Sequence, residues 1–167
     1  MTRVIDPLRD ARRPLHEGLR TIQVAANAVG TAEEPIARAA IEAALEYLTE
    51  EFLPTSRAEE FTIFIAMDGV YGTTDSCEVM KAQHASIAAM VDDLERVAKA
   101  AEADGDAAAY ARYLHPLLHG LYALCRAHLE SEDDVYLPLL DESLSESQVG
   151  VLVDNLGRIA AGSAAPA

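Results

Sequence analysis

Several absences narrow what this chain can be. Its 167 residues include no tryptophan, only two cysteines, and 13 lysines and arginines against 28 aspartates and glutamates. Nucleic acids and anionic lipids are bound through clustered cations, so a net charge of −15 argues against both as partners. No run approaches the roughly 20 apolar residues of a membrane span, and the first residues lack the apolar stretch of a signal peptide. We therefore expect a cytoplasmic protein with no nucleic-acid and no membrane partner.

The two cysteines, Cys77 and Cys125, lie far apart and follow no Cys-x-x-Cys pattern. Disulfides are rare in reducing compartments, and metal-binding or redox-active cysteines usually come at short spacings. Both side chains are therefore predicted to be free thiols buried in a core.

What the chain does have is apolar residues, which make up 50% of it, at helical spacing nearly throughout. Four long helices are expected, at about residues 6–29, 31–72, 74–104 and 106–140. A short fifth helix should follow residue 145. Long helices joined by short loops form up-down-up-down bundles. The sequence thus predicts an all-α fold, a four-helix bundle with a short C-terminal fifth helix.

Short motifs mark where some of these helices begin and end. Thr31–Glu34 is a capping box that should open the second helix, and Ser145–Gln148 is another that should open the fifth. Pro54 should bend the second helix. No linker or internal repeat is visible, so residues 1–160 are expected to form a single domain, with a disordered tail at residues 161–167.

The fourth predicted helix carries polar residues on its inward face. Its inward positions, three and four residues apart, are Leu118, Leu121, Cys125, His128, Glu132, Val135 and Leu139. A glutamate that points into a core is costly unless it is paired, protonated or bound to a metal ion. His128 and Glu132, at i and i+4, project side by side, as two ligands of one cation must.

The other helices add similar groups at comparable depth. The inward face of the second predicted helix includes Thr55 and Glu59, and that of the third includes His84. His16 lies one position off the inward face of the first. Imidazoles and carboxylates are ligands of iron and zinc, and bridging carboxylates suit a pair of irons. We therefore predict a metal site inside the bundle with the ligands His16, Glu59, His84, His128 and Glu132.

Other interpretations stay open for these residues taken singly. A core histidine such as His84 can be a hydrogen-bonded structural residue. A pair such as His128 and Glu132 can lie on a solvated helix face, and Asp133 could replace Glu132 as a ligand. Five such groups on four helices favour a metal site.

Three residues near this region are expected to have other roles. His115 and His119 are spaced i, i+4, but His119 faces about 180° away from His128, so both are predicted to lie on the surface. Tyr136 is one turn beyond Glu132 and could donate a hydrogen bond to it.

Together, these segments resemble the hemerythrin-like, HHE cation-binding family. The resemblance covers about residues 8–140 and keeps the order and separation of four segments, Leu15–Glu17, Phe52–Glu60, Gln83–Ile87 and His128–Pro138. Members of this family are four-helix bundles that hold a non-heme di-iron centre. They bind or sense dioxygen, handle peroxide or nitric oxide, or sense iron.

The resemblance implies a role for each predicted ligand. By position, His16, His84 and His128 match histidine ligands of the family, while Glu59 and Glu132 match its two bridging carboxylates. In the family pattern, His84 and His128 share one iron. His16 shares the other iron with a histidine of the second helix.

The chain departs from the family in that second helix, where the usual His-x-x-x-Glu reads Thr55-Ser-Arg-Ala-Glu59. A threonine hydroxyl is a poor neutral ligand, and losing even an outer partner of a ligand costs about 10–100-fold in metal affinity. Glu60 is a candidate replacement, although it lies one residue off the inward face. We therefore expect an asymmetric di-iron centre, with one firm iron position and one weak or labile position.

Two functions are compatible with these observations. The first is a non-heme iron protein that binds or senses a small oxidant (dioxygen, peroxide or nitric oxide) or iron itself. The alternative is a degenerate bundle, with no metal or a single metal ion, that serves as a protein-interaction module. Enzymatic activity such as peroxide dismutation needs two-electron cycling between paired irons, so the sequence does not assign one.

Overall fold

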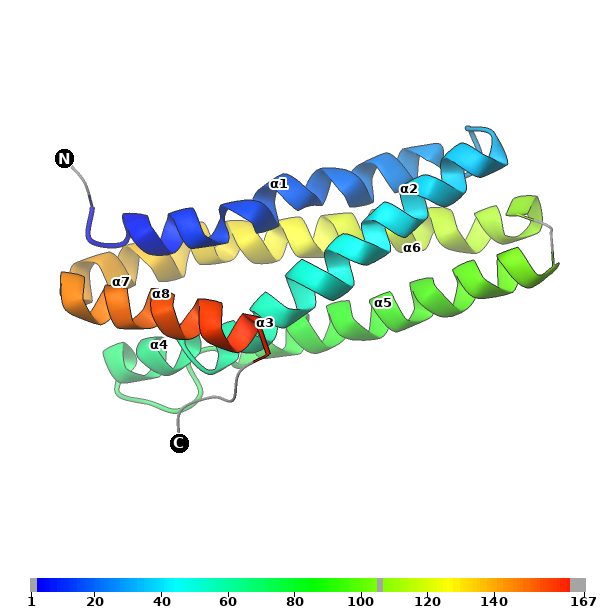
Figure 1. The fold of residues 1–167 in the computed structure, drawn as a ribbon. Helices are drawn as coiled ribbons and strands as arrows, with labels where there is room; N and C mark the ends of the chain where they lie inside the picture. Colours follow the sequence, from blue (N-terminus) through cyan, green and yellow to red (C-terminus); the bar gives the residue numbers. More distant parts are fainter. Residues whose placement is uncertain (1–2, 105–106, 163–167) are drawn as a thin grey trace.

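The protein is described by a computed structural model that covers residues 3–104 and 107–162, and the described residues form helices joined by short connections (Figure 1). Its elements are α1 (Asp6–Ala28), α2 (Glu34–Tyr47), η1 (Leu48–Phe52), α3 (Leu53–Glu60), α4 (Ile63–Tyr71), α5 (Glu78–Asp104), α6 (Ala107–Ser131), η2 (Glu132–Tyr136), α7 (Leu137–Ser143) and α8 (Glu146–Ala160). The second predicted helix corresponds to α2 to α4, and the fourth to α6 to α7. The predicted tail lies outside the described residues from position 163 onward.

Two groups of buried apolar side chains hold these helices together. The first core consists of Leu15, Ile22, Ala25, Ala26, Val29, Ile41, Ala44, Tyr47, Leu48, Phe52, Ile87, Val91, Leu94, Leu114, Leu118, Leu121, Cys125 and Leu129. The second core consists of Ile5, Leu8, Ala58, Ile63, Phe64, Met67, Cys77, Met80, Leu137, Leu140, Val149 and Leu156. Cys77 and Cys125 are both buried and free, as predicted.

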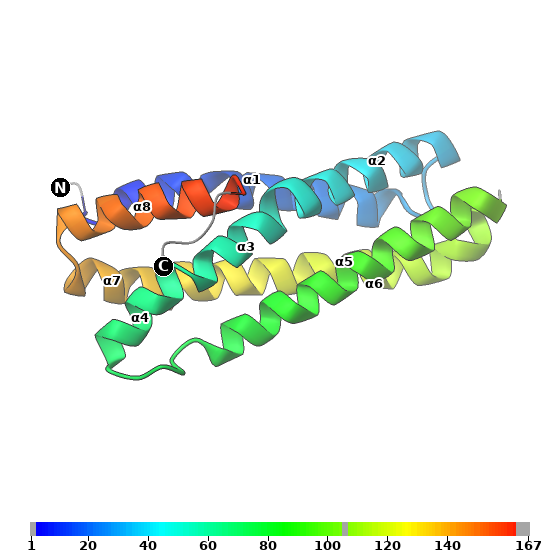
Figure 2. The same cartoon turned by 60° about the horizontal axis from the view of Figure 1, so that its bottom comes forward.

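Each long helical stretch contributes to both cores, in an order that alternates along the chain. α1 passes from the second core to the first, and α2 to α4 return from the first to the second. α5 and then α6 to α7 repeat the pattern. Successive stretches are therefore antiparallel, and the predicted all-α bundle of four long helices with a short fifth helix is confirmed (Figures 1 and 2).

The fifth helix, α8, covers the second core. It packs on α3 and α1, and the figures show it lying along this end of the bundle (Figures 1 and 2). Val149 and Leu156 are the residues of α8 that are fully buried in the second core. The predicted capping box is present: the Ser145 backbone N–H donates to Oε1 of Gln148 over 3.0 Å.

The predicted capping box at the start of the second helix was wrong. The Thr31 hydroxyl donates to backbone carbonyls at the end of α1, those of Asn27 and of Ala28, the latter at 3.3 Å. Glu33 is instead the residue that precedes α2, and Pro35 lies in the first turn. A hydroxyl that is already satisfied by the preceding helix cannot cap the next one.

Two prolines explain the π-helical turns η1 and η2. Pro54 and Pro138 each follow a π turn by two residues, and proline has no N–H for the carbonyl four residues earlier. The residue before each proline bonds five residues back instead, Leu53 to the Leu48 carbonyl and Leu137 to the Glu132 carbonyl. Each turn thereby inserts one extra residue into its helix.

The extra residue in η2 corrects the predicted inward face of the fourth helix. After Glu132, the next fully buried positions are Leu137 and Leu140, whereas Val135 is 49% exposed and Leu139 only partly buried. Leu137 lies five residues after Glu132, one more than the usual step of four, because its N–H bonds to the Glu132 carbonyl across the π turn. None of the described helices is long and apolar enough to cross a membrane.

Candidate metal centre

A layer of buried polar side chains separates the two cores. On each long helical stretch, the polar residue lies between a residue of one core and a residue of the other. The sequences are Leu8–Arg12–Leu15, Phe52–Glu59–Ile63, Met80–His84–Ile87 and Leu129–Glu132–Leu137, with His128 one turn before Glu132. Because the helices are antiparallel and meet both cores at matching depths, these side chains converge.

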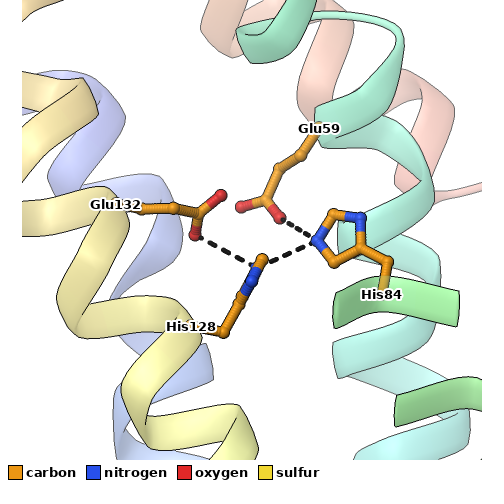
Figure 3. Close-up of side chains that lie close together, drawn as sticks. All are labelled: Glu59, His84, His128 and Glu132. Atoms are coloured by element: carbon orange, nitrogen blue, oxygen red, sulfur yellow. Dashed lines mark hydrogen bonds and ion pairs between the residues drawn. The ribbon is translucent and has the colours of Figure 1, made fainter. Parts of the chain in front are cut away.

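Four of them form a tetrad, Glu59, His84, His128 and Glu132, in which one ligand atom from each residue lies within 4.8 Å of the others (Figure 3). The two Nε2 atoms of His84 and His128 are 2.9 Å apart. Oε2 of Glu59 lies 3.7 Å from Nε2 of His84, and Oε2 of Glu132 lies 3.5 Å from Nε2 of His128. All four residues are at most 5% exposed.

The outer nitrogens of both imidazoles have acceptors. Nδ1 of His128 faces Oε1 of Gln83 at 3.0 Å, and Nδ1 of His84 faces Oε1 of Glu60 at 2.9 Å. An Nδ1 that donates to its acceptor leaves Nε2 of a neutral ring available to bind a metal ion in the tetrad. The 2.9 Å between the two Nε2 atoms is a hydrogen-bond distance, so one of them carries a proton that a bound metal ion would displace.

The charge states of the tetrad follow from its burial. Burial, the neighbouring His84 and Arg12 lower the pKa of His128 to about 3, so its imidazole is neutral. Burial and the nearby Glu59 carboxylate raise the pKa of Glu132 well above its usual value, although Arg12 opposes this. A ligating carboxylate must be ionised, so a bound cation would lower the pKa of Glu132 again.

The donor set fits one divalent metal ion. Two buried carboxylate oxygens, Oε2 of Glu59 and Oε1 of Glu132, have no hydrogen-bond partner in the structure. Leaving such atoms unpaired in a core is costly, whereas a bound cation would satisfy them. Two imidazole nitrogens and two carboxylates are a ligand set of ferrous iron and of zinc. The tetrad could therefore hold one such ion.

Arg12 also binds both carboxylates, and in Glu132 it binds the same oxygen, Oε2, that lies 3.5 Å from Nε2 of His128. Its Nε donates to Oε1 of Glu59 at 2.9 Å, its Nη2 to Oε2 of Glu132, and its Nη1 to Oδ1 of Asp133 at 3.0 Å. The guanidinium is 1% exposed. Burial alone would lower the pKa of Arg12, but the surrounding carboxylates, Glu132 foremost, raise it, so the side chain stays charged.

The structure brings together four of the five predicted ligands and leaves out the fifth. The side chain of His16 is 36% exposed, and its Nε2 lies 3.1 Å from Oδ2 of Asp133, outside the tetrad. Thr55 is only partly buried, and the fully buried hydroxyl in this turn belongs to the next residue, Ser56, whose Oγ has no partner.

Three residues of the site were missed or undervalued by the sequence reasoning. Arg12 was not singled out, although it continues the apolar pattern Ile5, Leu8, Arg12, Leu15 in steps of three, four and three. Gln83 comes directly before His84 in the sequence, and Glu60 comes directly after Glu59. Gln83 contacts the imidazole of His128 and Glu60 that of His84, so each imidazole is held by a residue adjacent in sequence to another ligand.

Two further predictions are settled by the structure. Tyr136 does not donate to Glu132, because the only described partner of that carboxylate among hydrogen-bond donors is Arg12. The ring of Tyr136 instead packs at a tilt against that of Phe64, with 6.5 Å between the ring centroids. His115 and His119 are exposed, as predicted, with their Nε2 atoms 3.2 Å apart.

Comparisons with known proteins agree with this picture. A model of the hemerythrin HHE cation binding domain matches residues 3–140, which include α1 to most of α7 and the whole polar layer. Neither the curated proteins nor the solved structures gave a match.

Proposed function

The chain belongs to the hemerythrin HHE cation-binding domain family, and from this premise we propose that it is a non-heme iron protein that binds a small oxidant. Dioxygen, peroxide and nitric oxide are the ligands in question. The tetrad of Glu59, His84, His128 and Glu132 would hold the iron. The observation that carries the proposal is the convergence of two buried Nε2 atoms with two buried carboxylate oxygens that have no hydrogen-bond partner among the described residues.

The four donors of the tetrad suit both iron and zinc, and membership of the hemerythrin family favours iron. Zinc is satisfied by four ligands, whereas ferrous iron accepts six and prefers mixed imidazole and carboxylate sets. When bound at the tetrad, iron would supply open coordination positions for a small ligand.

The residues of this chain would keep such a site rigid and dry. The ring of Phe64 stacks on His84 at 5.3 Å and 16°, and that of Phe52 tilts against His128 at 6.1 Å between centroids. Gln83 and Glu60 fix the direction of the two imidazoles. Apolar walls exclude water, which strengthens electrostatic interactions inside the site.

Metal content and nitric oxide binding test this proposal. Untagged protein should be loaded with ferrous iron without oxygen, desalted and measured for iron per chain. It should retain iron and, with nitric oxide, give the half-integer-spin EPR signal of a nitrosylated ferrous centre. His84→Ala should lose both properties. The exposed pair His115 and His119 could bind metal by itself, so all samples should also carry His115→Ala and His119→Ala.

Protein that retains no iron, or that retains equal iron after His84→Ala, would refute the proposal. The first outcome would favour the alternative of a metal-free bundle that binds another protein.

A further inference from the structure

We infer that Arg12 takes the place of a second cation, so that the centre holds one metal ion and not a pair. The inference rests on the proposed function, because it concerns how many ions the same site accepts. Its basis is the position of the guanidinium on the carboxylates of Glu59 and Glu132.

Arg12 occupies three of the carboxylate oxygens that could hold a second metal ion. Arg12 binds one oxygen each from Glu59, Glu132 and Asp133. The Glu59 carboxylate is divided between two neighbours, with Oε1 on the guanidinium and Oε2 facing His84. A carboxylate that bridged two metal ions would offer one oxygen to each, and here the guanidinium receives the share of the second.

The charge and burial of Arg12 also oppose the binding of a second metal ion. The guanidinium is 1% exposed and cannot lose its proton, so it is a permanent positive charge inside the layer. A divalent ion placed within a few ångströms of it in a medium of low dielectric would be strongly repelled. One guanidinium and one divalent ion together already supply three positive charges against the four carboxylates around the layer, those of Glu59, Glu60, Glu132 and Asp133.

Asp133 and His16, the other metal-binding side chains near Arg12, also have partners. Asp133 is shared between Arg12 and His16, through Oδ1 at 3.0 Å and Oδ2 at 3.1 Å. His16 thus lies at the partly exposed edge of the layer, one turn after Arg12 on α1. With Arg12 absent, the oxygens of Glu59, Glu132 and Asp133 and the imidazole of His16 would be free to ligate a second ion.

A single metal ion narrows the chemistry of the site. A lone iron exchanges one electron, whereas conversion of dioxygen to peroxide, or peroxide dismutation, within a pair of irons needs two. The ligand class is therefore one that a single ferrous ion binds, such as nitric oxide.

A titration of metal-free protein with Co²⁺ decides the question. Co²⁺ takes the same ligands as ferrous iron and is stable in air, and its d–d absorption reports coordination. The wild type and Arg12→Lys, which keeps the charge, should each bind one Co²⁺ per chain. Arg12→Gln, which removes it, should bind two, the second at least tenfold more tightly than any second ion in the wild type. All three samples carry His115→Ala and His119→Ala, and circular dichroism checks their folding.

Two Co²⁺ ions in the wild type would overturn the inference while leaving the proposed function intact, and this arm does not depend on any Arg12 variant folding. A single ion in folded Arg12→Gln would overturn it as well, because the exclusion would then lie elsewhere. Failure of the wild type to bind any ion would overturn both the inference and the proposed function.

Discussion

At the scale of single residues, the centre depends on side chains that hold the ligands as much as on the ligands themselves. The imidazole of His128 has one possible direction because Gln83 accepts its Nδ1 proton over 3.0 Å. Glu60 does the same for His84 over 2.9 Å. Such outer partners fix the tautomer and the ring orientation, and metal affinity depends on both.

Replacing Gln83 should therefore weaken metal binding without removing a ligand. Gln83→Leu leaves the Nδ1 proton of His128 without an acceptor, and we expect Co²⁺ affinity to fall about 10–100-fold. Gln83→Glu retains an acceptor oxygen at the same place and should stay within a few-fold of the wild type. Competition titrations against a chelator of known affinity measure both. Equal affinities for the two variants would show that Gln83 does not orient the imidazole.

Buried Cys125 should make the protein sensitive to alkali. Burial raises the pKa of its thiol from 9.0 to about 12. Above pH 9 the unfolded chain releases this proton while the folded chain keeps it, so the free energy of unfolding should fall as pH rises. A single group contributes about 1.4 kcal/mol for each pH unit in that window. Tyr47, whose pKa burial also raises, acts in the same direction.

Chemical denaturation at several pH values tests this expectation. Cys125→Ala should lower stability at neutral pH, because it leaves a cavity, but should flatten the slope above pH 9. An unchanged slope in the variant would mean that the thiol is not responsible.

The sequence pattern located the tetrad but not what surrounds it. Glu59, His84, His128 and Glu132 lie in phase with apolar neighbours, and helical periodicity alone places such residues inward. Arg12 lies in phase as well, but a long cationic side chain usually extends to solvent, so its burial depends on carboxylates that come from other helices. Those are contacts between segments far apart in the chain, which periodicity does not encode.

At the scale of the elements, the ends of the long helices could be predicted from the sequence, whereas the π turns within them could not. Gly30 and Gly72 end α1 and α4 with positive φ angles of 76° and 67°, where predicted. The π turns before Pro54 and Pro138 were not predicted, because only the bending effect of proline was considered. Their extra residues explain why the predicted inward faces lose phase near Thr55 and beyond Glu132.

One glycine allows two helices to approach closely. A Cβ at Gly18 of α1 would overlap the ring of Tyr47 in α2, whose hydroxyl donates to the Leu15 carbonyl over 2.6 Å. Alanine favours a helix by up to about 1 kcal/mol over glycine, but overpacking costs about 1–3 kcal/mol and the buried hydrogen bond about 1 kcal/mol more. Gly18→Ala should therefore lower the free energy of unfolding by about 1–3 kcal/mol.

Gly69 of α4 is the matched control. No heavy atom lies within 4 Å of a Cβ built there, so Gly69→Ala should raise stability by about 0.5–1 kcal/mol through helix propensity alone. Urea denaturation measures both variants. Equal shifts of the same sign would show that the contact between α1 and α2 is not as close as described.

Two valines of α8 test how far this helix contributes to the bundle. Val149 is 1% exposed and packs in the second core, whereas Val151 is 59% exposed on the same helix. Val149→Ala should cost about 2 kcal/mol through lost burial and a small cavity, while Val151→Ala should change stability by less than about 0.5 kcal/mol. Equal costs in urea denaturation would mean that α8 does not seal the second core.

At the scale of the whole molecule, the polar layer divides the interior into two cores and weakens the metal-free bundle. The apolar residues on either side do little to stabilise its buried carboxylates and imidazoles. Two of the carboxylate oxygens have no hydrogen-bond partner among the described residues. A cation that binds the folded chain and not the unfolded one would repair this defect and stabilise all four helices together.

Thermal unfolding should reveal that linkage. At a free metal concentration about 100 times the dissociation constant, binding adds about 2.7 kcal/mol, or roughly 5–10 °C in Tm for a domain of this size. The shift should be reversed by a chelator and absent in His128→Ala, but kept in His115→Ala/His119→Ala. A shift that survives in His128→Ala would place the bound metal outside the tetrad.

The most direct test of the central claim is anomalous diffraction from crystals of untagged, iron-loaded protein, with data collected on both sides of the iron absorption edge. The account predicts one iron peak per chain, within ligand distance of Nε2 of His84 and Nε2 of His128, with Arg12 still bound to Glu59 and Glu132. Iron found only at His115 and His119, or no iron between the two buried imidazoles, would contradict it.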